Sequence, residues 1–109
     1  MADAARLDRT FDAFAHPIRR AMLERLAAGE LTVGEAGAGL GVAKPTISRH
    51  LKVLEAAGAV ERVVDGRTHR LRLAEAPLAE AEAWAARQRR LWRRKFDVLE
   101  DYLREEERR

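Results

Sequence analysis

Apolar residues near the amino terminus recur every three or four positions, which is the spacing of one face of an α-helix. Leu7, Phe11 and Phe14 follow this spacing, with mostly polar residues between them. The pattern predicts an amphipathic first helix over residues 1–15 with a narrow apolar stripe. The helix should end there because the residue before Pro17 is disfavoured in the helical conformation.

Glycines and prolines divide the segment from Pro17 to Ala57 into three further helices. Pro17 suits the first turn of a helix that Gly29 closes. Thr32 can cap the next helix, which extends to about Leu40. Its three glycines each cost up to about 1 kcal/mol relative to alanine, so tertiary packing has to hold it. The last of the three spans residues 44–57, and its apolar face is formed by Ile47, Leu51 and Leu54.

After Gly58 the apolar period changes from that of a helix to the alternation of a β-strand. The runs 60–64 and 68–73 flank an Asp65-Gly66 dipeptide, which is a strong signal for a β-hairpin. A final helix is predicted over residues 77–105. The fold class is therefore mainly α with a small β-hairpin, in the order four helices, hairpin and long helix, within a single domain 1–109.

Composition narrows the class of protein. The chain has 109 residues, no cysteine and a formal charge of +3. The absence of cysteine excludes disulfides, a thiol nucleophile and thiolate metal sites. No apolar run reaches the roughly 18 residues that span a bilayer, and Met1-Ala2-Asp3 lacks the basic start of a secretion signal. A cytoplasmic protein that makes no membrane contact is expected.

A short helix, a glycine turn, a second helix and a hairpin form a winged helix-turn-helix, with the two helices over 32–57 and the wing over 60–73. The stretches HPIRRAML (16–23), KPTISRHLKVLEAAGAV (44–60) and DGR (65–67) resemble the ArsR-type family of bacterial transcriptional repressors. The resemblance extends over nearly the whole chain. It implies a sequence-specific regulator that binds double-stranded DNA.

The second helix of such a motif lies in the major groove. Arg49 can bond guanine in bidentate fashion, the hydroxyl side chains can donate to a base or phosphate, and Lys44 and Lys52 suit phosphates. For any one of these residues, a solvated helix face is an equally good interpretation. The family resemblance adds Arg67 and Thr68 of the wing. The predicted DNA-binding residues are Lys44, Thr46, Ser48, Arg49, Lys52, Arg67 and Thr68.

One position departs from the family pattern. ArsR-like sequences usually have a serine just before the second helix of the motif, and here Ala43 occupies that position. Losing such a cap costs about 1 kcal/mol. Val42, beside it in the turn, is expected to point into the core. We expect residues 33–43 to be loose in the free protein and to become ordered on DNA.

The length of the last helix predicts a homodimer. A helix of this length measures about 42 Å, whereas a compact domain of this size has a radius of gyration near 13 Å. It should therefore pair with another subunit and set two DNA-binding helices about 34 Å apart on a pseudo-palindromic site. The alternative is that its apolar residues only cover their own core. The predicted interface residues of the terminal helices are Leu7, Phe11, Phe14, Trp92, Phe96, Leu99 and Leu103.

Six of the Lys and Arg residues lie within the segment 87–95, which we call the basic segment. Like charges four residues apart on a helix repel each other, so a partner for them is expected. The candidates are first-helix acids (Asp3, Asp8 and Asp12), the acidic run 105–107 of a partner chain, and DNA phosphates. A solvated face is the common alternative.

Other functions have little support in the sequence. The last helix contains no histidine, so metal sensing and a metal cofactor are not expected. An organic effector, a protein, or concentration alone could control the regulator. GAGLG at 37–41 is not followed by the Gly-Lys-Ser/Thr of a phosphate loop, and Ser48 and His50 do not face each other on a helix. His16, His50 and His69 suit structural roles. A winged helix that binds a protein is the remaining alternative.

Overall fold

The computed structural model describes residues 2–109, apart from the side chains of Ala2 and Asp3. The predictions for Met1 and for the Asp3 carboxylate therefore lie outside the described residues. The elements are α1 (Ala2–Phe14), α2 (Pro17–Ala27), β1 (Leu31–Thr32), α3 (Val33–Gly37), α4 (Lys44–Ala56), β2 (Val60–Asp65), β3 (Thr68–Leu73) and α5 (Ala76–Arg108). The prediction of a mainly helical winged fold is confirmed.

The helices begin where the sequence provides caps. His16 accepts a hydrogen bond from the Ile18 N–H through Nδ1 at 3.1 Å, which fixes the start of α2. Thr32 and Glu35 form a reciprocal capping box at the start of α3. Ala43 precedes α4 without a side-chain cap, as predicted.

The turn between α3 and α4 differs from the prediction. Helix α3 ends at Gly37 and not near Leu40, because Gly39 and Gly41 adopt positive φ angles of 71° and 77° that a right-handed helix excludes. The turn therefore starts earlier. The prediction that Val42 points into the core is wrong, since 38% of its surface is exposed.

The wing belongs to a three-stranded antiparallel sheet in the order β1-β3-β2. The predicted hairpin is confirmed, with Asp65 opposite Thr68 and Gly66 at a φ of 61° in the turn. Strand β1 was not predicted. It pairs Leu31 with Leu71, so the central strand β3 is hydrogen-bonded on both edges beside the core.

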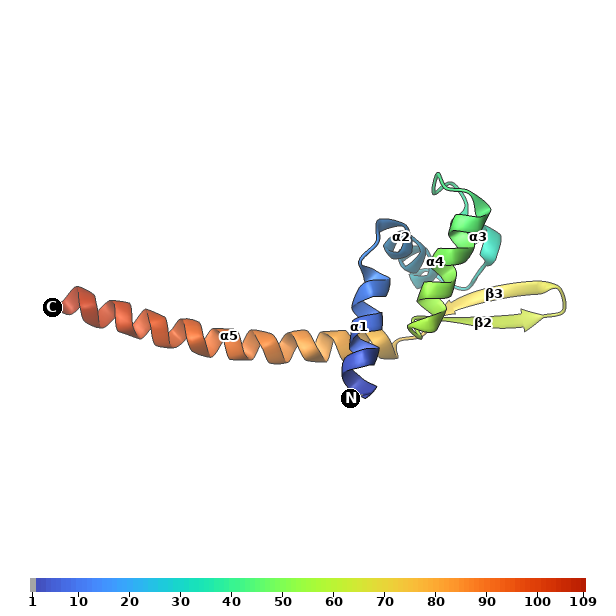
Figure 1. Cartoon of the computed structure of the whole chain (residues 1–109). Helices are drawn as coiled ribbons and strands as arrows, with labels where there is room; N and C mark the ends of the chain where they lie inside the picture. The colour runs from blue at the N-terminus through green and yellow to red at the C-terminus, as the bar shows by residue number, and fades with distance from the viewer. Residues whose placement is uncertain (1) are drawn as a thin grey trace.

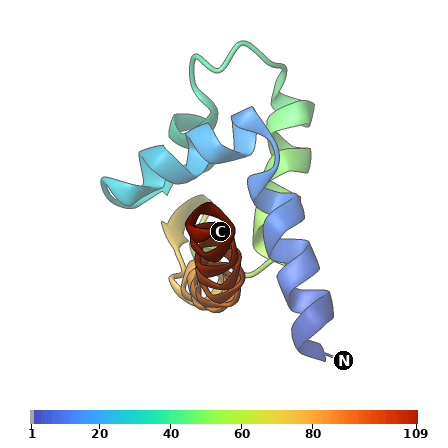
Figure 2. The same ribbon diagram turned by 90° about the vertical axis from the view of Figure 1, so that its left-hand side faces the viewer.

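Two regions of different character make up the molecule (Figure 1). We call residues 2–88 the head and residues 89–109, the outer part of α5, the arm. The head has one core, centred on Met22, Leu51, Leu54 and Leu71. Every residue of the arm is exposed, and the arm gives the molecule its extents of 74 × 31 × 22 Å. Seen along α5, helix α1 lies on one side of α5 and α2 lies above it (Figure 2).

Helix α1 anchors the root of α5. The Phe11 and Trp84 rings meet edge to face with centroids 5.3 Å apart, and Arg6 forms an ion pair with Glu80 at 3.2 Å. The apolar stripe of α1 is therefore partly used within its own chain. Phe14 is half-buried against the core, and Leu7 is half-buried as well.

Candidate nucleic-acid interface

Packing against the core fixes which face of α4 is available to a ligand. Ile47, Leu51 and Leu54 are buried, which turns the opposite arc of the helix outward. Gly37 lets α3 approach closely, because a Cβ there would lie 2.7 Å from Ile47 Cγ2. The two helices are thus held in contact while the polar face of α4 remains open.

The sequence predicts five DNA-contacting residues on that face. Four of them (Lys44, Ser48, Arg49 and Lys52) are exposed, and Thr46 is half-buried. Within residues 2–109, none of the three cations has an ion-pair partner. Their charges are therefore not neutralised by the chain itself and are free to meet an anion.

The wing carries a second set of cations, and some of them are already held in ion pairs. Arg62 is held by Glu55, with Nη2 to Oε1 at 2.7 Å, and by His69 at 3.0 Å. Arg72 is held by Glu61 at 2.9 Å. Arg67 at the tip has no ion pair among residues 2–109, and both it and Thr68 are exposed. Arg67 and Thr68 line a hollow between the wing and α3.

Arg70 is a further candidate that sequence analysis did not select. In register it lies opposite Val63 on one side and Thr32 on the other, on the sheet face away from buried Leu71. The alternation of β3 could have identified it, because it shares a face with Thr68. Hydrogen bonds from Thr32 hold the pKa of Glu35 below its usual value, and the charge of Arg70 lowers that pKa further.

His16, His50 and Arg19 connect α4 to the corner between α1 and α2. Arg19 donates to the carbonyl oxygens of Ala13 at 2.8 Å and Asp12 at 2.7 Å, and its Nη1 lies 3.2 Å from His50 Nδ1. The His16 and His50 rings lie 4.3 Å apart. Burial lowers the pKa of His50, and the charges of His16 and Arg19 act in the same direction. His50 is thus a packed residue joining α4 to the α1–α2 corner, as predicted.

The basic segment lies at the other side of the head from α4 (Figure 1). Its six cations are exposed. In the described part of the chain they form no ion pair, neither with Asp8 and Asp12 of α1 nor with acids of α5. No neutralising partner is therefore observed among the described side chains of a single chain.

Residues 2–109 lack two other kinds of feature. No three His, Asp or Glu side chains gather as a metal-binding group would. No helix there is both long enough and apolar enough to cross a bilayer.

The helix-turn-helix motif is similar to that of known regulators. A family model described as a helix-turn-helix domain matches residues 14–63. The HTH-type transcriptional regulator Rv2034 of Mycobacterium tuberculosis is 52% identical over 50 residues, which covers 46% of this chain and 47% of that protein. The matched part is about half the length of the curated relatives.

Solved structures extend the similarity to most of the chain. The crystal structure of the ArsR family transcriptional regulator RHA00566 superposes with a TM-score of 0.78 at 34% identity, covering 83% of this chain and 93% of that one. The solution structure of the homodimeric winged helix-turn-helix domain of Mb0332 from Mycobacterium bovis superposes with a TM-score of 0.65. It is 26% identical, over 83% of this chain and 85% of that domain.

Proposed function

Because the chain belongs to the ArsR family of transcriptional regulators, we propose that it is a homodimeric repressor that binds a pseudo-palindromic operator in double-stranded DNA. One observation carries the proposal. Lys44, Arg49 and Lys52 lie exposed on the one face of α4 that the core leaves open, with no ion pair among the described residues 2–109. A cationic helix face of this kind suits the phosphate-lined major groove.

The side chains on α4 have different tasks. Arg49 bonds the O6 and N7 atoms of a guanine, which specifies sequence. Thr46 and Ser48 donate to bases or phosphates, and Lys44 and Lys52 bind phosphates, which adds affinity without specificity. On the wing, Arg67 and Thr68 contact the adjacent minor groove or backbone, with Arg70 beside them.

The two subunits pair through their terminal helices. The arm carries Trp92, Phe96, Leu99 and Leu103 with half or more of each side chain exposed, and the domain of Mb0332 is a homodimer. Phe11 and Leu7 of α1 add to this surface, and Phe14 contributes the part that its own core leaves free. Pairing sets the two α4 helices about one turn of DNA apart, or about 34 Å.

The proposal assigns no catalysis and no cofactor to the chain. A regulator of this kind acts where the chromosome lies, so the proposed compartment is the cytoplasm. Occupying an operator blocks transcription of the adjacent gene, and an organic effector or a protein could release it.

The test is a salt titration of binding to an operator selected from random DNA. Lys52→Ala should reduce the slope of log affinity against log salt by about 1 and weaken all sequences alike. Arg49→Ala should lower discrimination between bases by about 10- to 100-fold. Arg9→Ala is the matched control, because it removes an exposed charge from α1. Equal effects of all three variants would favour the winged helix that binds a protein.

A further inference from the structure

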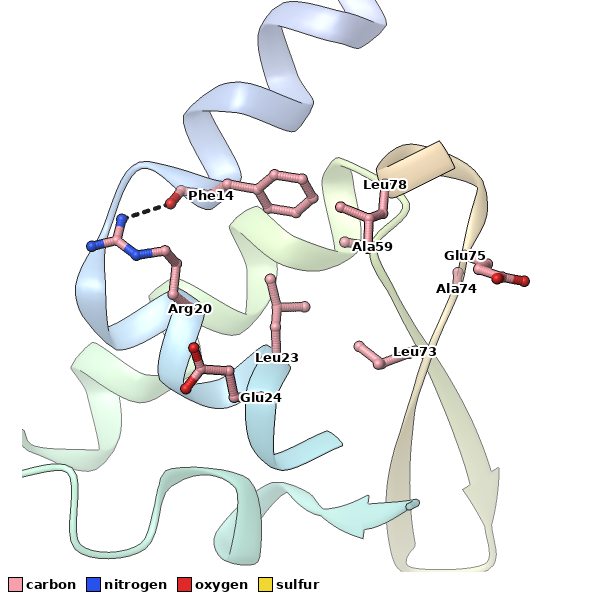
Figure 3. Close-up of a pocket in the computed structure, with 9 residues that line it drawn as sticks. All are labelled: Phe14, Arg20, Leu23, Glu24, Ala59, Leu73, Ala74, Glu75 and Leu78. Atoms are coloured by element: carbon pink, nitrogen blue, oxygen red, sulfur yellow. Dashed lines mark hydrogen bonds between the residues drawn. The ribbon is translucent and has the colours of Figure 1, made fainter. Parts of the chain in front are cut away.

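Two apolar depressions on the head differ in what lies beside them. One is a groove of about 470 Å³ at the root of α5, where α1, α2, β3 and α5 meet. Phe14, Leu23, Leu73 and Leu78 line it from these four elements (Figure 3). Phe14 is also one of the predicted interface residues, so this groove adjoins the proposed contact between subunits. The other depression lies between α3 and α4, and we call it the α3–α4 pocket.

The α3–α4 pocket has a volume of about 470 Å³ and mostly apolar walls. Val33, Ala38, Val42 and Ile47 provide its apolar side chains. Gly34 adds room, because a Cβ built there would point into open space. Val42 remains 38% exposed. The described residues 2–109 therefore leave the pocket open to a group from outside.

The α3–α4 pocket opens among the predicted DNA contacts. Lys44 and Ser48 line it and are exposed, and residues four apart lie on the same side of a helix. Val33 and Gly34 also line the hollow between the wing and α3, to which Arg67 belongs. The pocket therefore lies between the polar face of α4 and the wing, the two elements proposed to contact DNA.

An apolar pocket in this place selects among the groups that DNA presents. A phosphate would lose its hydration against the apolar walls, which is unfavourable for a charged group. In the major groove, thymine is the base that displays an apolar group, the C5-methyl, and the O4 acceptor lies beside it. The Ser48 hydroxyl can donate to such an acceptor, and Lys44 can bind a nearby phosphate.

We propose that the α3–α4 pocket holds the C5-methyl group of a thymine in each operator half-site. Val42 forms the apolar wall beside the methyl group, and the Ser48 hydroxyl donates a hydrogen bond to O4 of the same base. This inference rests on the proposed function, because it requires α4 to lie in the major groove.

The pocket supplies a discrimination that Ser48 alone lacks. A serine hydroxyl both donates and accepts hydrogen bonds, so it suits O4 of thymine as well as the N4 amino group of cytosine. The methyl group distinguishes these two pyrimidines, and only an apolar contact recognises it. Arg49 thus specifies a guanine, whereas Val42 and Ser48 together specify a thymine.

Deoxyuridine isolates the contribution of the pocket. It keeps every hydrogen-bonding group of thymine and lacks only the C5-methyl. Burial of one such group strengthens binding by a factor of about 4. Replacing the proposed thymine by deoxyuridine should therefore weaken binding about 4-fold in one half-site and about 15-fold in both.

The test replaces each thymine of the selected operator in turn by deoxyuridine and measures the affinity of the full chain at one salt concentration. One thymine per half-site should show the loss. Val42→Ser removes the apolar wall, so this variant should bind the thymine and deoxyuridine operators alike. Its affinity for the deoxyuridine operator should equal that of the unmodified chain. Val64→Ser, at a 59% exposed valine of the wing, is the matched control and should keep the preference for thymine.

A second variant tests the pocket from its other wall. Ala38→Leu adds a larger side chain that should occupy the space for the methyl group, so the preference for thymine should again disappear. Ala38 is exposed and lies outside the core, and circular dichroism checks that each variant keeps its fold. The test therefore does not depend on Val42→Ser alone.

Each outcome has a defined meaning. An operator that tolerates deoxyuridine at every thymine overturns the inference and leaves the proposed function standing. A methyl group that matters equally to the unmodified chain and to both variants also overturns it, because that group is then recognised elsewhere. Failure to select any operator contradicts the proposed function itself.

Discussion

The head and the arm have similar apolar patterns, but the apolar residues are buried in the head and exposed in the arm. In the head, Met22, Leu51, Leu54 and Leu71 are almost completely buried. In the arm, Phe96 and Leu99 are 65% and 52% exposed, although they too follow helical spacing. Periodicity thus specifies a helix in both regions, and only the tertiary structure shows which stripe its own chain covers.

The difference means that the arm has no tertiary packing of its own within the described residues 2–109. Its described side-chain contacts are local ion pairs such as Arg104–Glu100 at 2.6 Å, and a pair of this kind contributes about 0.2–0.5 kcal/mol. Most helical stability in proteins comes from packing an apolar face. The head can therefore fold on its own core, whereas we propose that the arm gains its stability from dimerisation.

The largest expected effect comes from placing a charge on the arm. Phe96→Glu should raise the dissociation constant of the dimer by about 100-fold or more, because a carboxylate enters an apolar contact twice per dimer. Sedimentation measures the constant. Thermal unfolding of the head should hardly change. Asp101→Ala, on the polar face, is the control and should leave the dimer intact; a dimer unaffected by Phe96→Glu would separate the arm from the interface.

The head should respond to truncation in its core. Leu54→Ala should lower the free energy of unfolding by about 2–5 kcal/mol, because it leaves a cavity at a fully buried position. Denaturant unfolding provides the measurement. Val98→Ala shortens an aliphatic side chain that is 70% exposed and should change the stability of the head by much less. Similar losses in both variants would contradict the distinction between head and arm.

A smaller effect is expected at the uncapped end of α4. Ala43→Ser should add about 1 kcal/mol of stability by providing the missing acceptor. It should also slow amide exchange over residues 33–43, which we expect to be fast in the free protein. Ala57→Ser, at the other end of α4, is the control, since serine is favoured only at the amino-terminal cap. Full protection of residues 33–43 in the unmodified free protein would refute the expected looseness.

The smallest effect is a pH dependence of the head. Because the folded-state pKa of His50 is lowered, the unfolded chain binds this proton more readily. The contribution of His50 to the free energy of unfolding is therefore fully present above the unfolded-state pKa of about 6.5. It decreases as the pH falls below that value. His50→Gln should reduce the loss of Tm between pH 7.5 and 5.5, whereas His69→Gln should not. Parallel curves for all three proteins would exclude His50 as a source.

Much of the fold follows from local signals. Apolar spacing locates α2 and α4, and Asp65-Gly66 locates the hairpin. Strand β1 has only two residues, too few for an alternating pattern, so its pairing with β3 depends on tertiary structure. The early end of α3 and the exposure of Val42 likewise depend on how the glycine turn closes.

The candidate site divides in the same way. The face of α4 could be predicted because Ile47, Leu51 and Leu54 must point inward. Arg70 could have been selected as well, because the alternation of β3 places it on the same face as Thr68. The sequence does not show that the neighbouring Arg62 and Arg72 are already held in ion pairs. The groove at the root of α5 could not be predicted from the sequence either, since its walls come from four elements far apart in the sequence.

The central claim is that two arms pair so that two α4 helices meet one face of a DNA duplex. Selection of bound sequences from random double-stranded DNA tests it most directly. The account predicts an enriched inverted repeat whose half-sites lie about 10 base pairs apart, centre to centre. No enriched sequence, or a single half-site bound by one subunit, would contradict it.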